Sequence, residues 1–511
     1  MRRQCRPSPT RTSLFREIGY RRRVGNHAME WAGMISPDSG LTSGPHSGPY
    51  MSLSPMPTDV DAAPIRTGLR VLVVGLGRFG GGVGVTRWLA DQGAAVTVTD
   101  QVGAASLADS IAALGDLSRI ALHLGGHDTS DVLDAELVII NPAVAKAQSE
   151  LFRTVEARGI PWTTELNLFC ERCLASVIGV TGTYGKSTTC AMLTHVLQAA
   201  AAGGSVPFTG VHLGGNIGRS LLPDLHRIRP TDIVVLEMSS AQLENLPRIP
   251  WTPRLAVITN LHPHHLDRYE RFSDYIDAKL NIIGAVDRTR CVVAGQLNAE
   301  AEKALLRKVG ADDPRLVRIE SSPVPFDLRV PGRHNQINAS GVLAVCGKLG
   351  LSEDFVRAAL RDFRGLPHRL EHVGTREGVT YCNDSKSTAP AATVQAVESL
   401  GSPIIVLIGG ESKKDLALEG FAETLARRCR MMIGFGEAGP AFIDAIRQAG
   451  GTGVQDRTLV AGTVEEAFRQ AVRFAEPGDT VLLSPGAPSF DAYVNYTERG
   501  RHFTDLVHAL V

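Results

Sequence analysis

The sequence predicts an α/β protein of three domains whose sheets are mainly parallel. Short apolar runs alternate with helical patterns from about residue 67 onward, and such alternation places parallel strands in sheets covered by helices. Two of the runs lead directly into glycine-rich turns, at 75–80 and 182–185. A length of 511 residues also suits three domains of ordinary size. We therefore expect domains at residues 67–175, 176–364 and 365–511.

Residues 1–66 differ in composition from the rest of the chain. They are rich in arginine and then in serine, proline and glycine, without helical or strand periodicity. Such a segment cannot bury a core, so we expect a disordered extension. Met51 and Met56 are alternative translation starts, which would leave the arginines outside the protein.

The overall composition excludes several classes of protein. The formal net charge is zero, which gives no electrostatic support for a nucleic-acid partner. No run of eighteen apolar residues occurs, so we expect no membrane-spanning helix. Eight cysteines are scattered except for Cys170 and Cys173, and no second pair completes a zinc set. This pattern favours reduced thiols and a cytoplasmic location.

The first expected domain begins with a glycine pattern. An apolar run leads into Gly75, Gly77 and Gly80, spaced G-x-G-x-x-G, and a second apolar run ends on Asp100. In a Rossmann-like domain such glycines approach a diphosphate and such a carboxylate binds a ribose. A further run ends in a turn at Asn141. The same geometry serves any diphosphate, so NAD and other nucleotides stay open here.

A phosphate-binding loop is expected at the start of the second domain. An apolar strand at 177–180 precedes T-G-T-Y-G-K-S-T, and a helical pattern follows. Gly182 and Gly185 would let backbone N–H groups surround phosphate oxygens, while Lys186 and Ser187 would serve the outer phosphates and Mg²⁺. The first glycine of the longer G-x-x-x-x-G-K-[ST] loop is missing. An incidental Gly-Lys-Ser turn is the alternative.

Three further positions are candidates for metal chemistry. Glu237 ends an apolar strand, where a carboxylate binds Mg²⁺ or its water; an acidic strand cap is the alternative. Three histidines within 262–265 suggest zinc, but adjacent histidines rarely share one ion, so we favour a single imidazole on a second Mg²⁺. Lys279 lies in the next helical pattern, where an exposed lysine is equally compatible with the spacing.

Six segments occur in a characteristic succession. T-G-T-Y-G-K-S-T, G-N-I-G, L-E-M-S-S-A-Q-L, H-H-L-D-R-Y and A-K-L are followed by G-R-H-N-Q-I-N-A at 332–339. This succession resembles the Mur ligases, the ATP-dependent enzymes that form amide bonds in peptidoglycan assembly, and the resemblance covers roughly residues 67–511. One departure is Tyr184, where the family usually has Asn or Ser. Because the backbone holds the phosphates, we expect binding to survive.

The resemblance implies ATP and Mg²⁺, with two ions, as cofactors. It implies that the catalytic residues are Lys186, His265 and Lys279, and that Lys279 becomes an anion when carbamylated. The implied ATP contacts are Gly182, Thr183, Gly185, Lys186, Ser187, Thr188, Asn338, Arg369, Asp384 and Lys386. The implied metal ligands are Ser187, Glu237, His265 and carbamylated Lys279.

The resemblance also implies the two other substrates. A UDP-sugar would contact the first domain and its neighbour through Gly77, Arg78, Gly80, Asp100, Asn141 and Asn216. In the third domain G-L-P-H-R, N-D-S-K-S-T, G-G-E-S-K-K at 409–414 and L-S-P-G-A-P-S-F-D with Arg499-Gly500 are similar to the branch that adds D-glutamate. This similarity implies acceptor contacts from Thr388, Lys413, Ser489 and Tyr496. The implied reaction joins D-glutamate to UDP-N-acetylmuramoyl-L-alanine through an acyl phosphate, in a cytoplasmic monomer.

Other functions remain open from the sequence. An NAD-dependent dehydrogenase leaves the phosphate loop, Glu237 and His265 without a use. A folate polyglutamylating ligase shares the ATPase core but lacks a leading domain such as 67–175. A non-enzymatic phosphate-loop module needs neither His265 nor Lys279. Another Mur ligase with a different acceptor amino acid is the nearest alternative.

Overall fold

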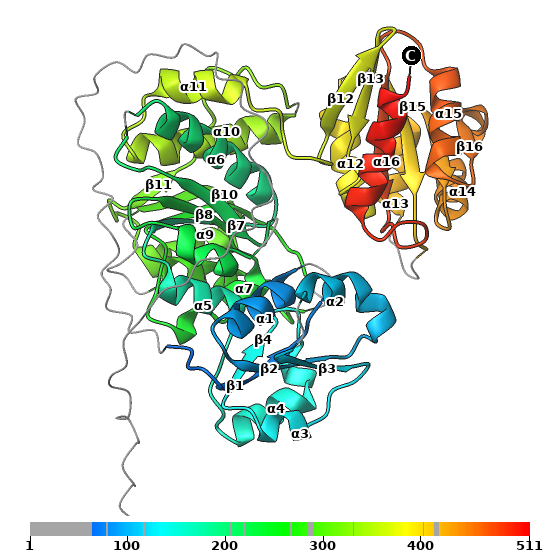
Figure 1. Ribbon diagram of the computed structural model, residues 1–511. Coiled ribbons are helices and arrows are strands. Elements are labelled where there is room, and N and C mark those ends of the chain that lie inside the picture. The colour runs from blue at the N-terminus through cyan, green and yellow to red at the C-terminus, as the bar shows by residue number, and fades with distance from the viewer. Residues whose placement is uncertain are drawn as a thin grey trace, which may run out of the picture.

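The protein contains three separate sheets, each with helices packed against it (Figure 1). The computed structural model describes residues 64–510 except 78–79, 116–117, 205, 218–219, 266–267, 285–290, 331, 402 and 413–417. The expected α/β class is confirmed. We expect disorder for residues 1–66, and residues 1–63 of that segment lie outside the described range.

The first sheet is parallel throughout and has the strand order β3-β2-β1-β4-β5. Its strands are β1 (Arg70–Val74), β2 (Ala95–Asp100), β3 (Ile120–Leu124), β4 (Leu137–Ile140) and β5 (Trp162–Thr163). The helices are α1 (Gly81–Asp91), α2 (Ala108–Leu114), α3 (Ser130–Leu133), α4 (Glu150–Ala157) and α5 (Glu165–Arg172). The strand order reverses between β1 and β4, and ligands bind beyond the carboxyl ends of strands at such a point.

The second sheet is also parallel, with the order β11-β10-β9-β6-β8-β7. Its strands are β6 (Ser176–Thr181), β7 (Val211–Gly215), β8 (Ile233–Glu237), β9 (Leu255–Leu261), β10 (Cys291–Leu297) and β11 (Leu316–Arg318). The helices are α6 (Lys186–Ala202), α7 (Ser240–Leu243), α8 (Phe272–Leu280), α9 (Ala299–Val309), α10 (Arg333–Lys348) and α11 (Glu353–Arg361). Every residue of β6 is buried, because helices or the first domain cover both faces of this sheet.

The first and second domains share one apolar core. A single cluster of buried side chains includes Val73 and Trp88 of the first domain and Val234 of β8. The opposite face of the second sheet packs against α6, α10 and α11, through side chains such as Leu193 and Val342. The carboxyl ends of β1, β2 and β4 therefore meet the second domain directly.

The third sheet has the order β12-β13-β17-β14-β15-β16, and β12 is its only antiparallel strand among the residues described. The strands are β12 (Glu371–Arg376), β13 (Val379–Asn383), β14 (Ile404–Gly409), β15 (Cys429–Phe435), β16 (Thr458–Val460) and β17 (Thr480–Gly486). The helices are α12 (Pro390–Ser399), α13 (Glu419–Arg428), α14 (Gly439–Gly450), α15 (Val464–Phe474) and α16 (Tyr496–His508). Two further clusters of buried side chains form its own core, one on each face of the sheet.

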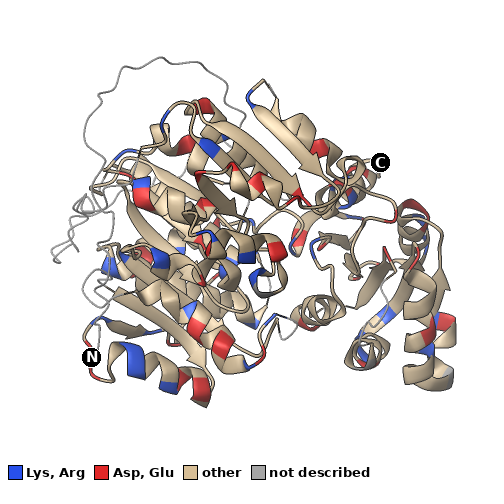
Figure 2. Ribbon diagram, turned by 90° about the horizontal axis from the view of Figure 1, so that it is seen from below, with Lys and Arg blue, Asp and Glu red and all other residues tan. Residues whose placement is uncertain are grey.

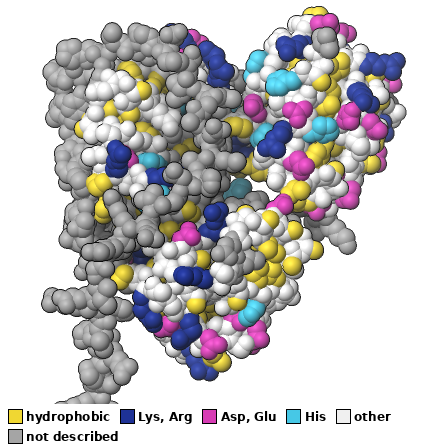
Figure 3. Space-filling model, viewed as in Figure 1, with side chains coloured by type: hydrophobic (Ala, Val, Ile, Leu, Met, Phe, Trp, Pro, Cys, Tyr) yellow, Lys and Arg dark blue, Asp and Glu magenta, His cyan; other side chains and the backbone are white. Residues whose placement is uncertain are grey.

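Charged side chains of both signs are interspersed over the described elements. Positions of Lys and Arg occur among those of Asp and Glu on the helices (Figure 2). The face drawn in Figure 3 carries no extended patch of one sign on its first and third domains. In the part of the chain that the structure describes, no helix is both long and apolar enough to cross a membrane.

Candidate active site

The loop between β6 and α6 turns at backbone positions that favour glycine. Gly182 and Gly185 have φ angles of 146° and 78°. A Cβ atom on Gly182 would lie 2.0 Å from Thr259 Oγ1, and one on Gly185 would lie 2.4 Å from Asn338 Oδ1. Neither position accepts a side chain without displacing its neighbour. The loop leads into α6, whose first N–H groups have no side-chain cap, and such a helix start attracts anions.

Tyr184 stands at the exposed tip of this loop, and its side chain takes no part in the loop's shape. Its backbone N–H donates to Asn260 Oδ1 at 2.9 Å, and its carbonyl accepts from Thr259 Oγ1 at 2.6 Å. The phenol ring is 40% exposed and lies 6.0 Å from the His262 ring. The end of β9 thus fixes the loop through its backbone, whichever side chain position 184 carries.

Two cations flank the loop. Lys186 Nζ donates to the carbonyl of Thr183 at 2.9 Å, and burial lowers the pKa of this amine, with Glu237 opposing and Arg369 reinforcing the shift. Arg369 comes from the third domain, and its Nη2 donates to Ser187 Oγ at 3.3 Å. The arrangement concentrates positive charge beside a loop of phosphate-binding shape.

Glu237, at the end of β8, has one unsatisfied carboxylate oxygen. The residue is 2% exposed, and its Oε1 accepts a hydrogen bond from Asn216 Nδ2 at 2.8 Å. Oε2 is buried and has no hydrogen-bond donor among the residues described. An unpaired buried carboxylate oxygen is costly, so the chemistry of this atom suits a hydrogen-bond donor or a cation.

Lys279 is buried, which contradicts its interpretation as an exposed helix lysine. It is 2% exposed, its Nζ donates to Thr181 Oγ1 at 3.3 Å, and the same atom lies 5.2 Å from the centre of the Tyr275 ring. Burial holds the pKa of this amine well below its ordinary value; Lys186 adds to that shift and Glu237 opposes it. Thr181 ends β6, so Lys279 lies directly beneath the phosphate loop.

The histidine cluster does not form a zinc site of the usual kind. His265 has a left-handed backbone with φ 56°, and its ring lies 4.2 Å from the ring of His264. Within the described ranges, no three His, Cys, Asp or Glu side chains gather around a common metal position. Zinc sites need three or four such ligands, whereas Mg²⁺ binds through one or two carboxylates together with phosphate and water.

A cavity of about 490 Å³ lies where the first and second domains meet. Its first-domain wall includes Gly75, Gly77, Asp100 and Asn141, which lie at or just after the carboxyl ends of β1, β2 and β4. The second domain contributes Asn216, Ser239 and Gln242, among others. The size is that of a small-molecule site. Because Asn216 also bonds Glu237, the cavity wall is tied to the carboxylate beside the phosphate loop.

Asp100 and Asn141 hold the glycine turn of this cavity in place. Asp100 Oδ2 accepts from the Gly77 N–H at 3.0 Å, and Asn141 Nδ2 donates to the Gly75 carbonyl at 3.2 Å. Gly80 has φ 84° and precedes α1 without lining the cavity. Arg78 lies outside the described residues.

In the third domain, the segments that carry the expected acceptor residues converge. Ser385 Oγ donates to the Tyr496 carbonyl at 2.8 Å, and the Gly486 N–H donates to the Ser387 carbonyl at 2.9 Å. Lys386 Nζ lies 5.4 Å from the centre of the Tyr496 ring. Thr388 and Ser489 belong to the same two loops, at 384–388 and 486–489. Lys413 lies outside the described residues.

Asp384 is the buried carboxylate of this group. Its Oδ2 accepts from Ser387 Oγ at 2.5 Å and from Ser484 Oγ at 2.7 Å, and its Oδ1 accepts from the Leu370 N–H at 3.2 Å. Burial raises the pKa of Asp384 to about 6, although these hydrogen bonds act in the opposite direction.

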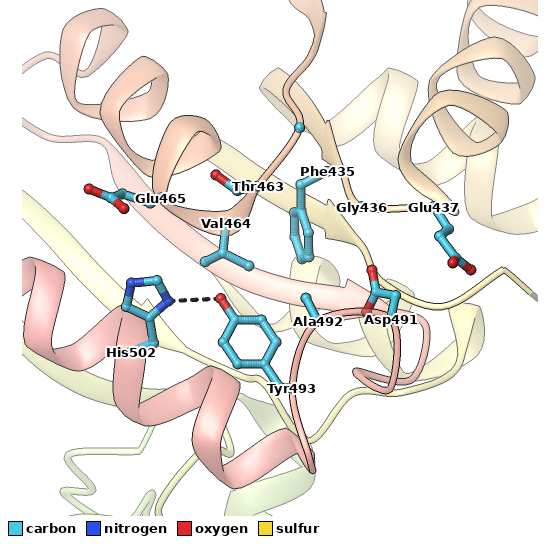
Figure 4. Close-up of a pocket in the computed structure, with 11 residues that line it drawn as sticks. Phe435, Gly436, Glu437, Thr463, Val464, Glu465, Asp491, Ala492, Tyr493 and His502 are labelled. Atoms are coloured by element: carbon cyan, nitrogen blue, oxygen red, sulfur yellow. Dashed lines mark hydrogen bonds between the residues drawn. The ribbon is translucent and has the colours of Figure 1, made fainter.

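A second cavity, of about 580 Å³, lies along the same edge of the third sheet (Figure 4). Carboxylates of Glu437, Glu465 and Asp491 line it, beside a Tyr493–His502 hydrogen bond of 2.8 Å. Three carboxylates disfavour a ligand that is itself a dicarboxylate. The convergent loops around Ser385 are therefore the better candidate for an acidic acceptor.

Comparison with protein families accounts for all three domains. Residues 69–163 match the Mur ligase MurD-like N-terminal domain, 180–311 the Mur ligase middle domain and 368–486 the Mur ligase glutamate ligase domain. A UDP-N-acetylmuramoylalanine--D-glutamate ligase of Symbiobacterium thermophilum is 34% identical over 464 residues, which cover 86% of this chain and 98% of that protein. The enzyme of the same name from Rubrobacter xylanophilus is 35% identical over 451 residues, covering 86% and 98%. The chain belongs to the Mur ligase family. It is accordingly an ATP-dependent ligase.

Solved structures show the same fold for this Mur ligase. The UDP-N-acetylmuramate-alanine ligase MurC of Thermotoga maritima matches with a TM-score of 0.54 at 20% identity, covering 86% of this chain and 99% of that one. MurF of Acinetobacter baumannii matches with a TM-score of 0.51 at 15% identity, covering 86% and 93%.

Several residues of this Mur ligase site were not expected from the sequence. Thr181, Asn260 and Tyr275 position Lys279 or the phosphate loop. Glu165 lines the 490 Å³ cavity and accepts a hydrogen bond from Ser220. Burial raises the pKa of Glu165. A polar residue at the end of an apolar strand was a usable signal for Thr181 and Asn260, but only the sheet order shows that both flank one loop.

Proposed function

We propose that this Mur ligase joins D-glutamate to UDP-N-acetylmuramoyl-L-alanine, with ATP converted to ADP and phosphate. The relatives that match nearly end to end carry the name of that reaction. The observation that carries the proposal is the hydrogen bond from Asn216 to Glu237, because it places the wall of the substrate cavity against the carboxylate beside the phosphate loop. A substrate carboxylate reaching past Asn216 meets the γ-phosphate there.

Each domain would hold one substrate. Residues 67–175 bind the UDP-sugar, with Gly77, Asp100, Asn141 and Asn216 around the cavity and Arg78 and Gly80 in the glycine turn. Residues 176–364 bind ATP through the phosphate loop, its Thr188 and Asn338. Residues 365–511 bind the amino acid through Thr388, Lys413, Ser489 and Tyr496, and they supply Arg369, Asp384 and Lys386 to the nucleotide.

The residues present fit Mg²⁺ beside the phosphate loop. Glu237 offers a buried carboxylate oxygen without a partner, and Ser187 offers a hydroxyl at the start of α6. Mg²⁺ would offset negative charge on the phosphates. His265 and Lys279 would serve a second ion. Burial lowers the pKa of Lys279, which favours the neutral amine, and a neutral amine reacts with CO₂ to give a carbamate and a proton.

The chain's own groups then support two chemical steps. An oxygen of the substrate carboxylate attacks the γ-phosphorus, ADP leaves, and an acyl phosphate forms; Lys186 balances the charge on the transferred group. The α-ammonium of glutamate then loses a proton, its nitrogen attacks the acyl carbon, phosphate leaves with the former carboxylate oxygen, and the nitrogen loses a second proton. Holding three substrates in line removes most of the entropic cost of this sequence.

The remaining expectations follow the same proposal. We place the reaction in the cytoplasm, where ATP is available, and propose a monomer that needs neither nucleic acid nor a membrane.

An acceptor panel tests the proposed function. Purified protein is incubated with ATP, Mg²⁺ and UDP-N-acetylmuramoyl-L-alanine, and D-glutamate, L-glutamate, L-alanine or diaminopimelate is added in turn. We expect ADP release and amide product with D-glutamate alone. Product with another amino acid would make the chain a different Mur ligase. Lys186→Ala serves as the inactive control, and Lys348→Ala, at an exposed lysine on α10, is the matched control.

A further inference from the structure

Arg499 is the largest side chain that is completely buried in the described part of the protein. It lies in the first turn of α16, and its guanidinium group makes four hydrogen bonds. Nε donates to Ser385 Oγ at 3.1 Å and Nη2 to the Ser385 carbonyl at 2.9 Å. Nη1 donates to the carbonyls of Ala487 and Pro488, both at 3.1 Å. The arginine therefore joins α16 to the loops at 384–388 and 486–489.

All four acceptors of Arg499 are neutral. Asp491 raises the pKa of Arg499 through space, but burial dominates and lowers that pKa to about 10, so the group stays charged at neutral pH. A buried arginine normally pairs with a carboxylate, since a buried charge without a counterion is costly. Among the residues that the structure describes, no carboxylate accepts a hydrogen bond from the guanidinium. The positive charge is left to act on its surroundings.

The position of the Arg499 guanidinium in the third domain indicates which loops its charge affects. β17 lies between β13 and β14 in the third sheet, and the loops that follow these strands meet around the guanidinium. A Cβ atom on Gly410, just after β14, would lie 2.9 Å from Arg499 Nη1. These are the loops to which we assign Thr388 and Ser489.

We infer that Arg499 is a positioning residue of the acceptor site. Its four hydrogen bonds set the spacing of the two loops, and its charge favours an acceptor that carries two carboxylates, because a cation in a low-dielectric interior acts over a longer distance than one in water. The inference rests on the proposed function, since it presumes that a dicarboxylic amino acid binds at these loops.

The test separates the acceptor from the other substrates. Arg499→Met removes both the charge and the planar set of N–H donors. Arg499→Lys keeps the charge but loses that planar set of donors. We expect Arg499→Met to raise the KM for D-glutamate by roughly tenfold to a hundredfold, the range for lost hydrogen bonds to a charged group, while the KM for ATP changes less than about twofold. Arg499→Lys should recover part of the loss.

The chain contains a matched control for this substitution. Arg457 also donates to backbone carbonyls, those of Gly453, Cys429 and Ala426, but it lies away from the acceptor loops. Arg457→Met should leave the KM for D-glutamate unchanged. If Arg499→Met and Arg457→Met alter all kinetic parameters alike, Arg499 is structural and the inference is wrong.

Two measurements keep the result decisive. If Arg499→Met does not fold, as judged by circular dichroism, Ser385→Ala decides, because it removes the Nε acceptor: a raised KM for D-glutamate supports the inference and an unchanged one overturns it. Inhibition by glutarate, a dianion, is compared with inhibition by butanoate, a monoanion, to isolate the effect of the Arg499 charge. The loss of binding in Arg499→Met should be larger for the dianion.

The outcomes also separate this inference from the proposed function. Wild-type protein that does not use D-glutamate at all would refute the proposed function. Normal wild-type turnover with unchanged Arg499 variants would refute only this inference.

Discussion

The environment of Lys279 differs from one of the two that its sequence context allows. Helical spacing alone is equally compatible with an exposed lysine, yet its side chain is 2% exposed and its Nζ contacts Thr181 beneath the phosphate loop. A permanent ammonium here would stand close to Lys186, whose charge already lowers the pKa of Lys279. A carbamate would reverse the sign of that interaction and provide oxygens for a cation.

This difference in charge is testable by substitution. Lys279→Ala should lower kcat by about a hundredfold or more, the loss typical of one electrostatic group in an active site. Formate or acetate should restore part of the activity by occupying the vacated anion position. Lys279→Arg should stay inactive with or without these anions, because it keeps a positive charge. Full activity of Lys279→Arg in steady-state assays would show that a simple cation suffices.

Asp384 gives a prediction about pH and stability. Its pKa rises from 3.8 to about 6 in the folded protein, so the folded state binds more protons than the unfolded state between these values. The free energy of unfolding should therefore fall as pH rises from about 4 to 6, by on the order of 2 kcal/mol, and then level off. Asp384→Asn should lose this contribution. Urea unfolding of both proteins between pH 4 and 7 measures the difference, and identical pH profiles would contradict the account.

At the scale of elements, the strands and helices around the phosphate loop follow from sequence pattern. The apolar run before Gly182 forms β6, and the pattern after Gly185 forms α6. In the third domain the apolar runs at 404–408, 431–435 and 480–483 form β14, β15 and β17. The antiparallel pairing of β12 with β13 was not expected, because a short, half-exposed strand such as β12 has little hydrophobic periodicity to mark it.

The turn between β6 and α6 is the element on which ATP binding depends. Gly185→Ala places a Cβ atom 2.4 Å from Asn338 Oδ1 at a φ of 78°, so the loop must move. We expect kcat/KM for ATP to fall by about a hundredfold, comparable to the loss of a preorganised hydrogen-bond donor. Gly204→Ala is the matched control, since Gly204 has a φ of 67° and no atom within 4 Å of its Cβ position. Equal effects of the two variants would assign the loss to backbone strain alone.

At the scale of the whole molecule, the three-domain α/β fold was accessible from the sequence, but the joint between domains was not. Hydrophobic periodicity reports which residues are buried, not which domain buries them, and the shared core that includes Val73 and Val234 left no separate signal. The hydrogen bond between Asn216 and Glu237 is a consequence of that joint. From the sequence, Asn216 was assigned to the UDP-sugar alone.

The cavity at this joint predicts which nucleotide stabilises the protein. Its walls come from both domains, so a ligand that fills it ties the domains together and raises the melting temperature by mass action. UDP-N-acetylmuramoyl-L-alanine at a concentration well above its Kd should raise Tm by several degrees, and NAD should not. Thermal shift assays with both ligands make the comparison. Protection by NAD without protection by the UDP-sugar would reverse the assignment of the first domain.

The central claim is that the γ-phosphoryl group of ATP is transferred to the substrate carboxylate before the amide bond forms. Substrate labelled with ¹⁸O in that carboxylate tests it directly, with the released phosphate analysed by mass spectrometry after turnover with D-glutamate. If the acyl phosphate forms, one ¹⁸O atom moves from the carboxylate to each phosphate released. Unlabelled phosphate, released in step with amide product, would contradict the account.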